Sequence, residues 1–127
     1  MRISFDYHGV CDVNPILFSK LTKSLMDCGI EVFIITGRMK EHNLEEDLNK
    51  LGISFTGIFS IIDYNVKKGN HVRFDENGEP WIEEDLWLKT KGVICEEQKI
   101  DLHFDDSDEY SEHFSTPYAR FYNNKNN

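Results

Sequence analysis

RISFDYHGVCD, residues 2–12, is the stretch of the sequence that decides the fold. A short, partly β-branched apolar segment ends at Asp6, and Gly9 follows three positions later. This order is typical of a buried strand that delivers a carboxylate at its C-terminal end, where open α/β sheets bind their ligands. We therefore predict a strand at residues 2–6 and a functional role for Asp6, although a lone aspartate at a strand end is more often a turn or cap residue.

The composition indicates one compact and acidic domain. The chain has 127 residues, of which 39% are hydrophobic and 13% aromatic, so a substantial core is expected. Its formal net charge is −9 and no cluster of lysine and arginine stands out, which argues against non-specific binding to nucleic acids or anionic membranes. Three widely spaced cysteines argue against a disulfide framework or a cysteine zinc site. With no signal-peptide pattern and no long apolar run, a soluble cytoplasmic protein is predicted.

Helix and strand signals alternate through the first half of the chain. Asn14 as N-cap and Pro15 at the first helical position begin a helix that Gly29 ends. Its buried face is predicted from apolar residues at helical spacing, namely Leu17, Phe18, Leu21, Leu25 and Met26. The next elements are predicted to be a strand at 31–35, a helix at 40–51 and a strand within 53–62, centred on residues 58–61. This alternation predicts a parallel sheet with right-handed crossovers.

The second half begins with a different pattern. An Asn-Gly turn between two short apolar segments predicts a small β-hairpin at 72–82. It is followed by a helix at about 84–97, a core strand at 100–104 and a short strand at 119–122. We expect residues 1–122 to form a single doubly wound, Rossmann-like α/β domain, and the polar residues 123–127 to form a disordered tail.

Polar side chains follow three of the predicted strands: Asp6, Thr36 and the pair Asp105-Asp106. The C-terminal ends of neighbouring parallel strands meet at one crevice. Carboxylates gathered there repel one another unless a cation lies between them, and an all-oxygen ligand set favours Mg²⁺. The acidic pair also fits an N-cap for a helix that starts near Ser107.

These motifs resemble, in order and along the whole chain, those of the haloacid dehalogenase (HAD) superfamily of phosphohydrolases. The first motif, DxDG[TV] after a strand, corresponds to residues 6–10 (DYHGV), the second to Thr36 at a strand end, and the fourth to the paired acids 105–106. The third motif is a lysine before the last core strand, and Lys91 is the closest match. The alternatives are Lys89 and, further from the pattern, Lys67 and Lys68. Since the segments between motifs are short, no large cap domain is expected.

The resemblance implies a Mg²⁺-dependent phosphomonoester hydrolase. Asp6 would be the nucleophile that forms an aspartyl-phosphate, while Thr36 and Lys91 would bind the transferred phosphoryl group. The implied metal ligands are Asp6, the backbone carbonyl of His8, Asp105 and Asp106. Gly37 and Arg38 would lie beside the substrate, although Arg38 also fits a solvent-facing role.

His8 departs from the family pattern, which places there a second aspartate that acts as general acid and base. Imidazole is a competent substitute near neutral pH, and general acid–base catalysis is worth about 10²–10⁴-fold in rate. We therefore expect a slowed enzyme rather than an inactive one. The alternative is a weak or inactive relative that binds a phosphorylated ligand or a protein partner. The expected substrate is a phosphorylated small molecule or an exposed phosphoester, and the oligomeric state stays open.

Overall fold

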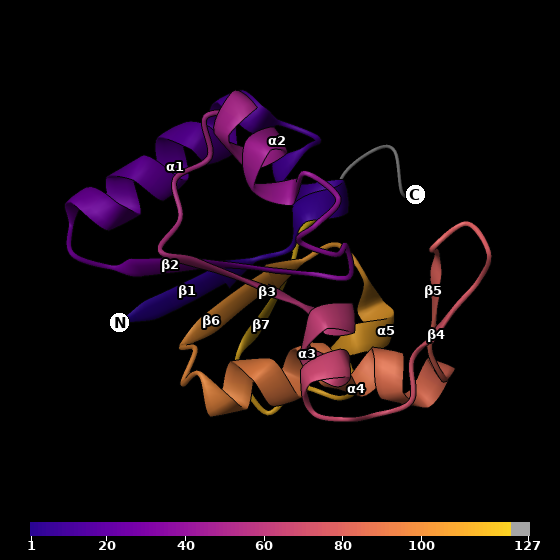
Figure 1. Ribbon diagram of the computed structural model, residues 1–127. Helices are drawn as coiled ribbons and strands as arrows, with labels where there is room; N and C mark the ends of the chain where they lie inside the picture. The colour runs from indigo at the N-terminus through magenta and orange to yellow at the C-terminus, as the bar shows by residue number, and fades with distance from the viewer. Residues whose placement is uncertain (123–127) are drawn as a thin grey trace.

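Five parallel strands form the central sheet of the computed structural model, which describes residues 1–122 (Figure 1). Their order across the sheet is β3 (Gly57–Ser60), β2 (Glu31–Thr36), β1 (Arg2–Phe5), β6 (Leu102–Asp105) and β7 (Tyr118–Arg120). In the central strand, Phe5 is aligned with Ile34 on one side and with Phe104 on the other. The chain thus builds outward from β1 in both directions, which confirms the predicted α/β class and agrees with a Rossmann-like topology.

Helices cover both faces of the sheet (Figure 1). One face carries α1 (Pro15–Asp27) and α2 (Leu44–Lys50), and the other carries α3 (Ile61–Lys67), α4 (Glu84–Glu97) and α5 (Asp108–Ser111). The predicted hairpin, β4 (Arg73–Phe74) and β5 (Pro80–Trp81), stands apart from the sheet beside the start of α4. None of the helices within residues 1–122 is long and apolar enough to cross a membrane. The predicted tail, 123–127, lies outside the described residues.

The ends of α1 agree with the sequence, but its buried face is turned by about one residue. The Asn14 side chain accepts a hydrogen bond from the backbone N–H of Leu17, and Gly29 follows the helix with φ +84°. The prediction that Leu17 is buried is wrong, because 47% of this residue is exposed. Phe18, which also belongs to the predicted face, is buried and packs edge-on against Phe5. Successive side chains of a helix point about 100° apart around its axis. Burial of the larger aromatic ring of Phe18 therefore turns Leu17 toward solvent.

Two elements in the middle of the chain differ from the prediction. Helix α2 begins at Leu44 rather than at residue 40, because Asn43 adopts a left-handed conformation with φ +59°. Strand β3 ends at Ser60, and Ile61 and Ile62 begin the unpredicted helix α3 instead of extending the strand. The Ser60 side chain caps this helix by accepting the backbone N–H of Asp63. A short buried apolar run suits a strand and a helix equally, so the sequence pattern alone does not separate them.

Candidate active site

The predicted site residues lie at the carboxyl edge of the parallel sheet. Asp6 directly follows β1, Asp105 ends β6 and Thr36 ends β2. Gly9, in the helical turn η1 (Tyr7–Cys11), has φ +83°, a left-handed conformation that explains the glycine three residues after Asp6. An open cavity of about 260 Å³ lies here, lined by Asp6, His8, Thr36, Gly37, Arg38, Trp87, Lys91 and Tyr110.

Lys91 is the candidate lysine that contacts the carboxylates. Its Nζ lies 3.1 Å from Asp6 Oδ1 and 2.8 Å from Asp105 Oδ2, and only 2% of its side chain is exposed. Lys89 lies elsewhere on α4 and forms an exposed ion pair with Asp85. Side chains two residues apart in a helix point about 200° apart around its axis, so Lys89 and Lys91 face opposite sides of α4. The structure therefore chooses between alternatives that the sequence leaves open.

The three aspartates form a compact cluster in which one oxygen of each lies within 4.8 Å of the others. Burial raises the pKa of Asp6 to about 8; the Lys91 charge opposes this shift, while Asp105 and Asp106 reinforce it. Burial and the Asp105 charge also raise the pKa of Asp106. One lysine thus does not neutralise the cluster, and the all-oxygen donor set suits a hard divalent cation such as Mg²⁺. Participation of the His8 backbone carbonyl stays a prediction.

A series of buried hydrogen bonds connects Asp105 to His103 and Ser4. His103 Nε2 lies 2.9 Å from Asp105 Oδ2, and His103 Nδ1 lies 2.7 Å from Ser4 Oγ. Burial lowers the pKa of His103, so we assign a neutral ring that donates from Nε2 to Asp105 and accepts the Ser4 hydroxyl at Nδ1. Although burial alone would raise the pKa of Asp105, the bond from His103 and the Lys91 charge hold it well below its usual range. Asp105 therefore stays ionised beside the weaker acid Asp6.

Ser4 and His103 are supporting residues that sequence reasoning missed. His103 is fully buried and contacts an acidic residue of the site. The available signal was a polar residue in the middle of each of two apolar strands. Ser4 and His103 are aligned in neighbouring strands, so each satisfies the other.

Two aromatic side chains wall the cavity. The Nζ of Lys91 lies 4.3 Å from the ring centroid of Tyr110, a residue that no sequence pattern singles out. Trp87 lies against Gly37 so closely that a Cβ there would meet the indole at 2.3 Å. Gly37 thus permits the close approach of the indole to the backbone after β2.

Thr36 and Arg38 differ in how free they are to bind a ligand. The Thr36 hydroxyl oxygen accepts the backbone N–H of Arg38 at 3.2 Å, which leaves its own proton available to donate. The Arg38 guanidinium lies 2.6 Å from Asp47 and 5.6 Å from the centre of the Tyr7 ring. Arg38 is therefore held against α2 while it lines the cavity, and its contact with a substrate stays a prediction.

His8 lies at the mouth of the cavity. Its side chain is 61% exposed, and its Nδ1 is 3.2 Å from Asp12 Oδ2.

The N-cap of α5 is Ser107 and not the acidic pair. The Ser107 side chain accepts the backbone N–H of Glu109. Capping thus does not account for Asp105 and Asp106.

No known protein family and no curated protein sequence matches this chain. The chemistry of the site must therefore be argued from its own residues. They offer a carboxylate at an open cavity, an acidic cluster that suits a divalent cation, a fixed ammonium group and a free hydroxyl donor. Such a set is suited to binding a small anion and to attacking it with a carboxylate oxygen.

Proposed function

We propose that this protein is a Mg²⁺-dependent phosphomonoester hydrolase of the HAD type in which Asp6 is the nucleophile. The observation that carries the proposal is the buried Lys91 ammonium, shared between Asp6 and Asp105 beside the further carboxylate of Asp106. A purely structural lysine needs one acidic partner, and an excess of buried carboxylates is costly. A cation together with a phosphate substrate accounts for all four groups.

The site residues would divide into ligands of Mg²⁺ and ligands of the phosphoryl group. Asp6, Asp105 and Asp106 would hold Mg²⁺, whose charge would offset that of the phosphoryl oxygens. Lys91 and the Thr36 hydroxyl would bind phosphoryl oxygens from the other side. The same positive charges would lower the pKa of Asp6 from its value of about 8, so that the nucleophile is ionised at neutral pH.

The proposed reaction has two displacements at phosphorus. First, a carboxylate oxygen of Asp6 forms a bond to phosphorus while the ester P–O bond breaks, and the leaving oxygen takes a proton from the His8 imidazolium. Next, a water oxygen attacks phosphorus and gives a proton to the now neutral His8. The bond between phosphorus and Asp6 breaks, which restores the carboxylate and releases inorganic phosphate.

The direct test is hydrolysis of 4-nitrophenyl phosphate with Mg²⁺ and with excess chelator. We expect Mg²⁺-dependent turnover that falls at least about thousandfold in Asp6→Asn, because removing a nucleophile abolishes the covalent route. The matched control is Asp27→Asn, an exposed aspartate on α1 that pairs only with Lys23 among the described residues; it should keep the full rate. Equal rates with and without Asp6 would exclude the proposed mechanism.

One observation favours the second candidate, a protein that binds a phosphorylated ligand without turnover. The exposed imidazole of His8 is paired with Asp12, outside the acidic cluster. We expect His8→Asp to separate the two candidates. If His8 is the working acid, the exchange lowers the rate by about 10²-fold or more, and a large gain in rate would show that His8 is a handicap. An unreactive binding protein shows no turnover in either form. Thermal stabilisation by inorganic phosphate without any turnover would favour the second candidate.

A further inference from the structure

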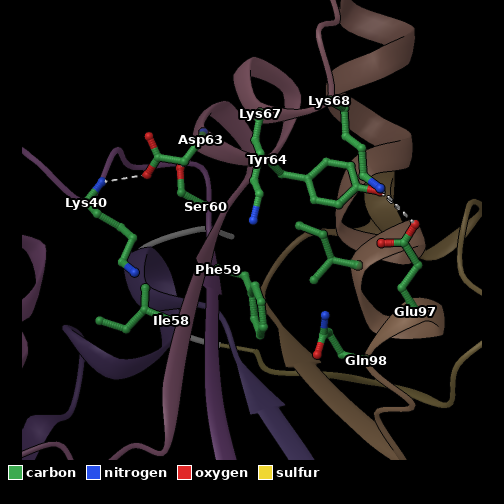
Figure 2. A pocket seen from close by; sticks show the side chains of 11 residues that line it. Lys40, Ile58, Phe59, Ser60, Asp63, Tyr64, Lys67, Lys68, Glu97 and Gln98 are labelled. Atoms are coloured by element: carbon green, nitrogen blue, oxygen red, sulfur yellow. Dashed lines mark hydrogen bonds and ion pairs between the residues drawn. The ribbon is translucent and has the colours of Figure 1, made fainter.

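A second cavity, of about 530 Å³, opens beside the edge strand β3 and shares no lining residue with the candidate active site (Figure 2). It lies between α3, the last turn of α4 and strand β3. Its volume is within the range of about 300–1,000 Å³ that is usual for small-molecule sites. The proposed hydrolase chemistry leaves this cavity unexplained.

The floor of this cavity is apolar. Ile58 and Phe59 of β3 and Ile94 of α4 line it. Ile58 and Phe59 are neighbours in a strand, so their side chains lie on opposite sides of β3, as Figure 2 shows. Tyr64 forms part of the wall and is fixed there by a hydrogen bond of 2.9 Å from its hydroxyl to Glu97 Oε1. The apolar surface that the cavity offers to a ligand is therefore centred on the half-buried Phe59 ring.

The rim of the cavity is positively charged in a protein of net charge −9. Three lysines line it: Lys40, Lys67 and Lys68. Lys68 lies 3.9 Å from Glu97, and the lining acid Asp63 accepts the backbone N–H of Lys40 at 3.0 Å. Within residues 1–122, the ammonium groups of Lys40 and Lys67 have no ion-pair partner, and both point toward the opening in Figure 2.

We propose that this cavity is a binding site for a small organic anion with a planar apolar body, such as an aromatic carboxylate, sulfonate or phosphate. An inorganic anion would leave the Phe59 surface in water, and a neutral ring would leave Lys40 and Lys67 unused. A metal cation is disfavoured by the lysines. The ring of the ligand would cover Phe59, while its charged group would lie near the ammonium groups of Lys40 and Lys67.

The test uses three probes that separate ring from charge: naphthalene-2-sulfonate, 2-naphthol and sulfate. Backbone amide resonances are followed by NMR during titration of the full chain. We expect saturable shifts at Phe59, Ser60 and Tyr64 with naphthalene-2-sulfonate, and binding at least about tenfold weaker with either of the other probes. Shifts confined to the residues around Asp6, or equal binding of 2-naphthol, would overturn the proposal.

Charge-removing variants complete the test without threatening the fold, because the lysines are exposed. Lys40→Gln and Lys67→Gln should each weaken binding of naphthalene-2-sulfonate about threefold to tenfold, while Lys20→Gln on α1 should leave it unchanged. Asp6→Asn should also leave it unchanged, so this inference and the proposed phosphatase function fail or succeed separately. Unaltered affinity in the Lys40 and Lys67 variants would overturn the inference.

Discussion

Lys91 shows how one residue is held by opposing electrostatic effects. Burial alone would lower the pKa of its ammonium group, but the charges of Asp6 and Asp105 outweigh burial and raise it above its ordinary value. A buried ion pair of this kind adds little net stability compared with an apolar replacement of all its members. Removing the lysine alone is different, because the ionised carboxylate of Asp105 is then buried without its cation.

We predict that Lys91→Met destabilises the fold by about 3–5 kcal/mol, because the variant leaves the buried, ionised carboxylate of Asp105 without its cation. Urea unfolding in metal-free buffer measures the change. The matched control is Lys89→Met on the same helix, where an exposed pair with Asp85 is lost and less than about 1 kcal/mol is expected. Equal losses in the two variants would contradict the assignment of Lys91.

Asp6 should make the stability of the metal-free protein depend on pH. Its pKa is about 8 in the folded protein and about 4 in an unfolded chain, so the folded state binds this proton more tightly. Its contribution to stability therefore decreases as the pH rises from about 4 to about 8. Asn has no such proton and still accepts the Tyr7 N–H that bonds to Asp6 Oδ1 at 2.8 Å.

We therefore expect Asp6→Asn to be more stable than the natural chain in chelator, by a margin that grows between about pH 5 and pH 8. Thermal or urea unfolding across this range measures the margin. Saturating Mg²⁺ should reduce it at the upper pH, because a cation favours the ionised carboxylate. A margin that shrinks with rising pH would show that the pKa of Asp6 is not raised.

At the scale of elements, α4 carries both the site lysine and a close backbone contact to the segment between α5 and β7. Gly92 follows Lys91 directly, and a Cβ added at Gly92 would lie 2.4 Å from the backbone oxygen of His113. The bare backbone at this position lets α4 approach closely. That approach sets the depth at which Lys91 enters the acidic cluster.

Gly92→Ala is predicted to destabilise the protein by about 1–3 kcal/mol, even though alanine is the better helix former. The clash is with backbone, so a rotamer change does not relieve it. Val93→Ala, at the neighbouring exposed position of α4, should change the unfolding free energy by less than about 1 kcal/mol. A stabilised Gly92→Ala protein would show that helix propensity outweighs this contact.

At the scale of the whole molecule, the two cavities differ in the charge of their linings: one contains a cluster of carboxylates and the other is rimmed by lysines. The hairpin β4–β5 is the element that stands clear of the layered body, and Figure 1 shows the sheet edge at the site without a covering domain among residues 1–122. This openness supports the proposal that the substrate carries an exposed phosphate group. The positive rim of the second cavity also offers a local exception to the overall charge of −9.

The sequence by itself determined the fold class and the polar residues at the C-terminal ends of three core strands. Asp6, Thr36 and Asp105 could be found because strand patterns and chain order place the residue after a buried strand at one edge of a parallel sheet. Helix α3 could not be found, because Ile61 and Ile62 continue an apolar run that also suits a strand.

Only the tertiary structure decided which groups meet. It selected Lys91 over Lys89, aligned Ser4 with His103, and placed the Lys91 ammonium group over the Tyr110 ring. Each of these contacts depends on how far a helix is rotated about its axis, or on packing between segments far apart in the chain. The sequence pattern specifies that a face is buried, but the packed side chains, such as Phe18 against Phe5, determine its final rotation.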